Sequence, residues 1–311
     1  IETLTRTLQG IARSAHADSH KMLWIINDGD PDVLNSIVRI LAHSGHISDP
    51  KFYGAYSVDS SSYGSARVYA GYYECGRHRI PYVVSAKETY QGSVDSLMMV
   101  LNFFRSLSSS PRQSDMFDVT GSAYSHTAPQ TIFLEEEVEA RMALLGHPPT
   151  AIDYCLLLDG SVQIDPLAIT QFVARMESNP EIVALSGTLY PVGRPSSLIQ
   201  ILQTFEFYLQ HFVSPICESL SNVTCPLNQL FTMYRVRLDS GDRCLGDDEL
   251  VASMDALMKS SVRYRHRTWP GNDCLLVPRM VRQFPQHRWS FEPNGRAEVE
   301  LTAHVMAAFD P

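Results

Sequence analysis

The sequence lacks the long apolar segments and the basic excess that mark two classes of protein. No apolar run approaches the length of about 20 residues that a membrane-spanning helix needs. The 25 Lys and Arg residues stand against 34 Asp and Glu residues, which gives a formal net charge of −9. Nucleic acid would therefore have to bind a local basic patch against an unfavourable overall field. We predict a globular protein without a nucleic-acid partner.

Cysteine is scarce and irregularly spaced. The chain has six cysteines but no Cys-x-x-Cys pair, and Cys155 lies inside an apolar, strand-like run. This favours reduced thiols in a cytosol-like compartment over a disulfide framework or a zinc site. The first residue is Ile1 and no signal-like segment is present, so we expect an excised or processed domain of a longer protein.

Short apolar runs alternate with segments that have the period of an amphipathic helix. Strands that alternate with helices of 10 to 15 residues are typical of an α/β fold with a mostly parallel central sheet and helices on both faces. Residues 108–130 are rich in Ser, Pro and Gly, which predicts a flexible loop within a single domain of residues 1–311. We predict strands at 22–26, 65–73, 80–87, 181–187 and in the run that ends at Asp159, and helices at 32–45, 94–107, 135–146, 166–180 and 197–213.

Acidic residues follow two of these predicted strands. Asp28 and Asp30 come after the strand at 22–26, and Asp159 ends the later apolar run. Ligands of α/β sheets bind outside the carboxyl ends of the strands, so these positions are candidate site residues. Turn formation explains all three about equally well, because Asp is a common turn residue next to Gly or Pro.

Five segments follow one another along the chain: "ARVYAGYY", "RIPYVVSAK", "DYCLLLDGSVQIDPLAITQFVARMESNPEIVALSG", "QTFEFYLQHFVSPICESLSNVTC" with "FTMYRVRL" soon after, and "GNDCLLVPRMVRQFPQH" followed by "FEPNG". In content and order they resemble the fungal chitin synthases, which are processive family 2 glycosyltransferases. The similarity extends from about Lys21 to Pro293, and "QTFEFYLQHFVSPICESLSNVTC" is the most specific segment.

The resemblance implies a glycosyltransferase-A (Rossmann-like) fold and a defined reaction. The family transfers N-acetylglucosamine from its UDP conjugate to a growing β-1,4-linked chain, with inversion, and uses Mg²⁺ or Mn²⁺. Such a transfer needs a base for the acceptor hydroxyl and a cation for the leaving diphosphate. The resemblance also implies a UDP-sugar ligand, a membrane-embedded region of the parent protein, and a location on the cytoplasmic side of the plasma membrane or a secretory vesicle.

The resemblance assigns roles to individual acids. Asp159 matches the first acid of the family's Asp-Ala-Asp motif and is the candidate for metal and nucleotide-sugar binding, whereas Ser161 stands in the place of the second acid. A neutral hydroxyl is a poor replacement for a carboxylate on a hard cation. The alternative is that Asp159 alone holds Mg²⁺ together with substrate phosphates, because that ion keeps several waters. Asp273 matches the catalytic base, although Asn272 and Cys274 replace its charged neighbours; capping of a helix is the alternative for Asp273.

The same comparison assigns the nucleotide and acceptor sides of the site. Asp28 and Asp30 match the nucleotide-binding strand end, and Lys87 matches a lysine that could meet phosphate; a solvated lysine is the alternative. On the acceptor side the candidates are Glu206, Thr224 and Cys225. The phenylalanines 205, 207 and 212 lie at helical spacing and are more typical of a core than of a sugar platform.

Several departures from the family remove charge that would face the diphosphate. They are Ser161, Asn272, the Gly92–Ser96 segment that has lost two cations, the altered loop around Cys225, and the family's Gln-Arg-Arg-Arg-Trp motif, which this sequence does not contain. Three hypotheses remain. The chain is a weakly active or inactive chitin-synthase-like domain, a non-catalytic pseudo-glycosyltransferase that regulates or binds a partner, or a generic α/β nucleotide-binding protein.

Overall fold

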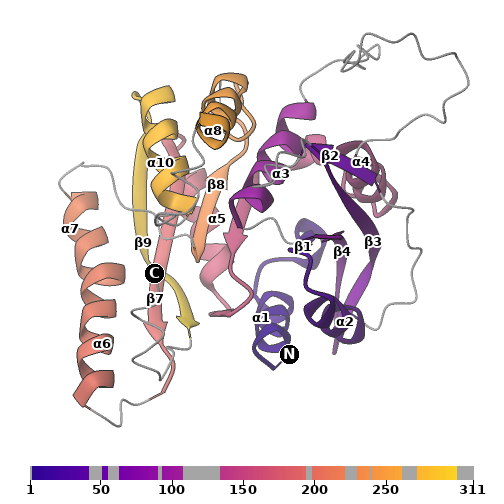
Figure 1. The fold of residues 1–311 in the computed structure, drawn as a ribbon. Coiled ribbons are helices and arrows are strands. Elements are labelled where there is room, and N and C mark those ends of the chain that lie inside the picture. Colours follow the sequence, from indigo (N-terminus) through magenta and orange to yellow (C-terminus); the bar gives the residue numbers. More distant parts are fainter. Residues whose placement is uncertain are drawn as a thin grey trace, which may run out of the picture.

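The structure is a computed structural model, and its helices and strands form two sheets with helices packed on their faces (Figure 1). The α/β class predicted from the sequence is confirmed, and each predicted strand and helix outside the 108–130 segment is present. That segment lies outside the described residues. The structure describes residues 2–41, 51–54, 63–89, 93–107, 134–193, 198–220, 230–238, 240–260 and 272–299.

The first sheet has four strands in the order β1-β4-β3-β2. Only β1 and β4 are parallel, with Asn27 opposite Ala86 at their carboxyl ends. A tight turn at Gly76, whose φ is +63°, joins β3 to β4 as a hairpin. The strands are β1 (Leu23–Asn27), β2 (Lys51–Gly54), β3 (Tyr63–Cys75) and β4 (His78–Lys87).

The second sheet has five strands in the order β5-β8-β7-β9-β6, and only β7 and β9 are parallel. The prediction of a mostly parallel sheet is therefore wrong for the described strands, since both sheets are mixed. Parallel neighbours need a long crossover, whereas short turns return the chain antiparallel. The strands are β5 (Tyr154–Leu158), β6 (Val162–Ile164), β7 (Ile182–Pro191), β8 (Phe231–Arg235) and β9 (Arg288–Val299).

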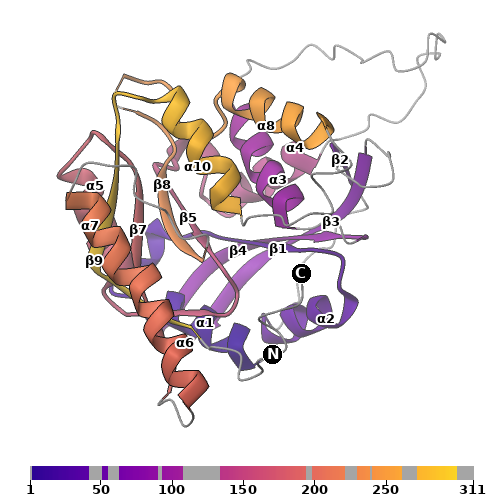
Figure 2. The same ribbon diagram turned by 60° about the vertical axis from the view of Figure 1, so that its left-hand side comes forward.

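Four helices cover one face of the sheets, as Figure 2 shows for the first sheet. Their apolar side chains form the largest core cluster, in which Met98, Phe103 and Met254 are fully buried. Burial of this apolar surface is the main force that holds the helices on the strands. The helices are α3 (Ser93–Ser106), α4 (Leu134–Leu144), α8 (Asp248–Ser260) and α10 (Asn272–Gln283).

The remaining helices lie on the other face or at the margin. α1 (Glu2–Arg13) and α2 (Pro31–Ile40) pack against the first sheet, and α5 (Ala168–Glu177) packs against the second. α6 (Leu198–Tyr208), a π-helical turn (Leu209–Val213) and α7 (Ser214–Leu220) form one rod at the edge of the molecule (Figure 1). No helix in the described part of the chain has the length and apolar character to span a membrane.

Candidate functional site

Asp28 and Lys87 meet at the carboxyl ends of the parallel strands β1 and β4. The strand register places Asn27 beside Ala86, so the next residue of each strand leaves the sheet at the same edge. Lys87 Nζ lies 3.0 Å from Asp28 Oδ1. The two predicted positions therefore lie in contact at the edge of the sheet where ligands of α/β folds bind.

Two residues of α3 complete this cluster, and sequence reasoning did not select them. Lys87 Nζ lies 2.7 Å from Asp95 Oδ2 and 2.9 Å from Ser96 Oγ, and the Lys87 and Asp95 side chains are 0% exposed. An ammonium group has three donors, and all three have a protein oxygen here. The solvated-lysine alternative is therefore wrong. Asp28, Lys87, Asp95 and Ser96 are called the Lys87 cluster below.

Asp30 and Asn27 extend the β1 end of the site. Asp30 Oδ1 accepts hydrogen bonds from the backbone N–H groups of Asp32 and Val33 at 2.9 and 3.2 Å, which makes Asp30 the N-cap of α2. Asn27 donates to the Asp30 carbonyl, while its buried Oδ1 accepts no hydrogen bond from the described residues. Buried acceptors normally have a donor, so Asn27 Oδ1 suits a ligand group at this strand end.

Asp159 lies in an exposed turn directly after β5. Its Oδ1 accepts a hydrogen bond from the Ser161 backbone N–H at 2.8 Å and a second one from the Ser161 hydroxyl. The Asp159 carbonyl accepts from the Val162 N–H at 3.1 Å, which closes the turn. Residues Asp159, Gly160 and Ser161 are called the Asp159 turn. One of its two carboxylate oxygens is thus already engaged inside the turn.

The donor set at the Asp159 turn does not fit the divalent cation that the resemblance implies. Mg²⁺ favours charged oxygens in near-octahedral geometry, and the turn offers one carboxylate and one neutral hydroxyl that bind each other. Across the described ranges, no group of three or more His, Cys, Asp and Glu side chains is placed to hold a metal ion. No chemical step is therefore assigned to a metal here.

Helix α1 also contacts the Asp159 turn. The Thr7 hydroxyl, with one proton to donate, lies 2.9 Å from the Gly160 carbonyl oxygen and 3.1 Å from the Thr3 carbonyl oxygen, and Thr7 is 3% exposed. Ser161 lines a small surface recess together with Thr3 and Arg6 of α1. The sequence offered no signal for these contacts, because 153 residues separate Thr7 from Gly160.

On the acceptor side, Glu206 is exposed on α6, and Gln210 Nε2 lies 3.4 Å from its Oε1. Phe205 is 59% exposed, so the expectation of a core residue is wrong there. Phe207 packs against the core of the second sheet, and the Phe212 ring contacts the Phe291 ring, as expected of core residues. Thr224 and Cys225 lie outside the described residues.

Asp273 is the second residue of α10, and its side chain lies outside what the structure describes. Its place in the first helical turn agrees with the helix-start alternative, since acids are favourable at the positive end of a helix. The structure therefore brings Asp28 and Lys87 together with Asp95 and Ser96. Asp30, Asp159 and Glu206 make the local contacts described above within their own turns and helix.

Two of the described cysteines have a thiol whose pKa is raised by burial. Burial raises the pKa of the Cys155 thiol on β5 to about 12, and it also raises the pKa of Cys244. Among the described cysteines, Cys75, Cys155, Cys217 and Cys244 form no disulfide. The raised pKa of Cys155 and Cys244 disfavours the thiolate, which is the form that acts as a nucleophile or metal ligand.

Comparison with known proteins gives a consistent result. A family model described as "Chitin synthase" matches residues 1–304. Chitin synthase C of Emericella nidulans is 24% identical over 94% of this chain and 26% of its own length. Chitin synthase 4 of Gibberella zeae is 23% identical over 98% of this chain and 26% of its own length. Chitin synthase 5 of Cryptococcus neoformans var. grubii is 24% identical over 96% of this chain and 15% of its own length. The chain thus spans about a quarter or less of these relatives.

Proposed function

The chain belongs to the chitin synthase family, and from this we propose a sugar-nucleotide-binding domain of the glycosyltransferase-A type that transfers N-acetylglucosamine weakly or not at all. In this proposal the carboxyl ends of β1 and β4 receive the uridine group of a UDP-sugar. The Asp159 turn lies on the diphosphate side. The domain acts mainly by binding, with little or no turnover.

The observation that carries the proposal is the engagement of Asp159 by Ser161. The family's reaction leaves a diphosphate, whose negative charge has to be neutralised by a cation held on acidic side chains. Here Ser161 replaces the second acid, and its N–H and hydroxyl both bind the carboxylate of the first. A bound Mg²⁺ or Mn²⁺ would supply that neutralisation, but the turn provides too little negative charge to hold it well. We therefore expect any UDP binding to depend little on the metal.

The electrostatics of the Lys87 cluster support binding of the uridine group. Two carboxylates, Asp28 and Asp95, surround one ammonium group, so the cluster carries a formal charge of −1. A site with that charge disfavours phosphate and favours hydrogen-bond donors, such as the uracil N–H and the ribose hydroxyls. The Asp28 side chain is 23% exposed and can accept from such donors, whereas Lys87 is enclosed.

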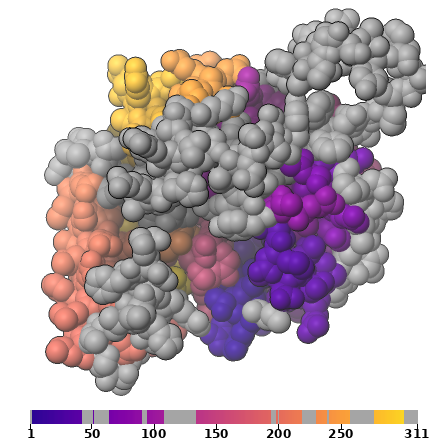
Figure 3. Space-filling view, in the orientation of Figure 1, coloured from indigo at the N-terminus to yellow at the C-terminus, as the bar shows by residue number. Residues whose placement is uncertain are grey.

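A partner-binding role is the second candidate, and the surface of α6 favours it. Figure 3 shows α6 and α7 (salmon) at the surface of the molecule. Large apolar side chains on one helix that are open to solvent mark interaction sites. A candidate partner is the membrane-embedded region of the parent protein, with this domain on the cytoplasmic side of the membrane. The exposed side chains, all between 40% and 72% accessible, are Leu198, Ile201, Leu202, Phe205, Tyr208 and Leu209.

Calorimetric titration tests the proposal. The chain is titrated with uridine, UDP and UDP-N-acetylglucosamine, each with and without Mn²⁺, and with ADP as the control nucleotide. We expect uridine and UDP to bind with little metal dependence and ADP not to bind. Preferred binding of ADP would support a generic nucleotide-binding protein instead. Formation of radiolabelled polymer from UDP-N-acetylglucosamine by the purified chain would overturn the proposed lack of turnover.

A further inference from the structure

Helix α1 runs along the segment that begins with the Asp159 turn. The helix contacts this segment at two points, and the residues just after the helix contact it at a third. Thr7 Oγ1 lies 2.9 Å from the Gly160 carbonyl oxygen and 3.1 Å from the Thr3 carbonyl oxygen, and Gly160 is the nearer acceptor for its single proton. Gly10 lies against Ile164, so close that an added Cβ would stand 3.3 Å from the Ile164 carbonyl oxygen. Beyond the helix, the Ala15 N–H donates to the Pro166 carbonyl at 2.7 Å. The helix therefore follows the turn and β6 over their whole length.

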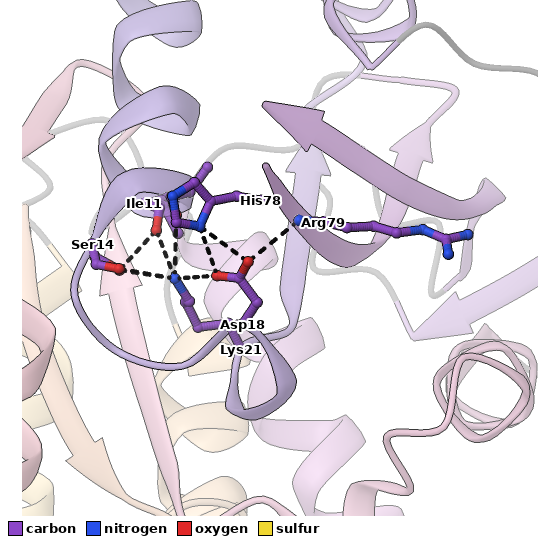
Figure 4. A network of polar contacts seen from close by, with 7 residues as sticks. Ile11, Ser14, Asp18, Lys21, His78 and Arg79 are labelled. Atoms are coloured by element: carbon purple, nitrogen blue, oxygen red, sulfur yellow. Dashed lines mark hydrogen bonds and ion pairs between the residues drawn. The ribbon is translucent and has the colours of Figure 1, made fainter. Parts of the chain in front are cut away.

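The other end of α1 is attached to the first sheet through a buried lysine (Figure 4). Lys21 Nζ lies 3.3 Å from the carbonyl oxygens of Ile11 and Ala12 at the end of α1 and of Ser14 just after it. It also lies 2.9 Å from Asp18 Oδ1, and the Lys21 side chain is 5% exposed. The Lys21 ammonium group donates to carbonyl groups at the carboxyl end of α1, where the negative end of the helix dipole favours a cation.

Asp18 connects this lysine to β4. Its Oδ2 lies 3.1 Å from His78 Nδ1 and accepts from the Arg79 backbone N–H at 3.3 Å. Burial alone would raise the pKa of Asp18, but hydrogen bonds and charge from Lys21, with hydrogen bonds from His78 and Arg79, bring that pKa below its ordinary value. Asp18 is therefore an anion at neutral pH and holds α1 to the start of β4, the strand that ends at Lys87.

The two sheets are joined by apolar packing and by further elements, and strands of both sheets contribute to the largest core cluster. β1 is the edge of the first sheet and β5 the edge of the second, and the two sheets are hydrogen-bonded as separate sets of strands. Their candidate site residues, the Lys87 cluster at the first sheet and the Asp159 turn at the second, therefore take their relative position from elements that contact both. α1 is such an element, through Thr7 at one end and Lys21 with Asp18 at the other.

The geometry points to α1 as a clamp that sets the position of the Asp159 turn relative to the nucleotide-binding end of the first sheet, with Thr7 as the positioning residue. This inference rests on the proposed function, because the turn is taken to face the diphosphate of a UDP-sugar. Thr7 touches the backbone of Gly160, the central residue of the turn, and not the ligand. Its loss should therefore affect the diphosphate-sugar part of the ligand and leave the uridine part unchanged.

The first experiment measures the turn without any ligand. Thr7→Val removes the hydroxyl at nearly constant volume, Thr7→Ser keeps it, and Thr170→Val makes the same change at an exposed position on α5. In the wild type the Ser161 and Val162 amides both donate inside the turn. Their hydrogen exchange should become about tenfold faster in Thr7→Val, the effect of one net hydrogen bond. Exchange in β7 (Ile182–Pro191) should not change, and Thr7→Ser and Thr170→Val should resemble the wild type.

The second experiment compares uridine with UDP-N-acetylglucosamine by calorimetry in the same variants. Thr7→Val should weaken UDP-N-acetylglucosamine binding by roughly fivefold to tenfold. Uridine binding should be unchanged, and Thr7→Ser should recover the loss. A helix that merely stabilises the fold would weaken both ligands equally.

The two experiments separate failure of the inference from failure of the proposed function. Unchanged exchange in the turn of Thr7→Val overturns the clamp, and so does an equal loss of affinity for both ligands. Absence of uridine binding in the wild type overturns the proposed function instead. In that case the exchange rates still decide whether α1 holds the Asp159 turn.

Discussion

Lys87 Nζ lies 2.7 Å from Asp95 Oδ2, and both side chains are completely buried between β4 and α3. Removing an ammonium and a carboxylate from water costs several kcal/mol each, which the pair recovers only through close contact and further hydrogen bonds. Ser96 and Asp28 provide two such contacts to the same Nζ. The end of the candidate site at β1 and β4 is therefore built on a buried ion pair, and Asp28 contributes the partly exposed carboxylate.

Replacement of Lys87 should destabilise the chain strongly. Lys87→Met keeps the length of the side chain but leaves the buried Asp95 carboxylate without its cation. We expect the free energy of unfolding to fall by about 3–5 kcal/mol, as measured by urea denaturation at neutral pH.

The double variant Lys87→Met/Asp95→Leu is the matched control for this buried pair. Removing both charges should recover part of the lost stability, because no uncompensated charge remains. If the single and double variants are equally unstable, the loss comes from packing rather than from the ion pair.

Restoring the second acid of the Asp159 turn should create a metal response. Ser161→Asp adds a carboxylate where the hydroxyl now binds Asp159. We expect Mn²⁺ to strengthen UDP binding of this variant by roughly tenfold, compared with little change in the wild type. Ser161→Asn is the neutral control and should show no response to Mn²⁺. No gain in Ser161→Asp would show that the rest of the diphosphate pocket does not fit.

Stability should fall as the pH drops below about 6.5, because two histidines are disfavoured as cations in the folded state. Burial and the charges of His20 and Lys21 lower the pKa of His16, and burial and His20 lower the pKa of His147. Below the ordinary histidine pKa of about 6.5 the unfolded chain binds more protons than the folded chain, so protons favour unfolding. Asp18 acts in the same direction at lower pH, since its lowered pKa stabilises the fold at neutral pH and this contribution is lost as the pH falls to about 4 and below.

Urea unfolding at pH 7.5, 6.5 and 5.5 measures this dependence. The double variant His16→Asn/His147→Gln should show a flatter decline than the wild type, because two groups with lowered pKa no longer take up protons on unfolding. An identical slope in both proteins would assign the acid sensitivity to other groups, of which His211, whose pKa burial also lowers, is the first candidate.

Two glycines with positive φ should respond very differently to alanine. Gly246 has φ +80°, and an added Cβ would lie 2.4 Å from the Arg105 backbone nitrogen, whereas Gly76 has φ +63° and open space around it. Gly76→Ala should cost about 1 kcal/mol from backbone strain alone. Gly246→Ala adds a clash with the end of α3 and should cost more than about 3 kcal/mol in thermal or urea unfolding. Equal losses would show that α3 moves aside without cost.

The order and type of the elements could be read from the sequence because they depend on local pattern. The apolar runs at 22–26 and 80–87 and the helix-period segment at 94–107 all form the expected elements. Strand direction could not be read in the same way. Whether β8 runs parallel or antiparallel between β5 and β7 depends on which strands meet, and apolar period carries no information on that.

Within the site, a partial signal existed for the Lys87 cluster. Asp95 and Ser96 match the last two residues of the family's Gly-Lys-Arg-Asp-Ser segment, whereas the two cations of that segment are lost. The structure shows that the retained acid binds Lys87. For Phe205 the prediction of a helix was correct, but the prediction that its side chain is buried was wrong. The burial of a helix face depends on what packs against it.

By itself the sequence determined the α/β class, the family, and the places where acids follow strands, since these depend on composition, apolar period and the order of segments. Only the tertiary structure decided that Lys87 is enclosed by Asp95 and Asp28, and that Thr7 holds the Asp159 turn from 153 residues away. The reason is physical. Burial and hydrogen-bond partners are properties of groups brought together by folding, and a position in the chain does not specify its neighbours in space.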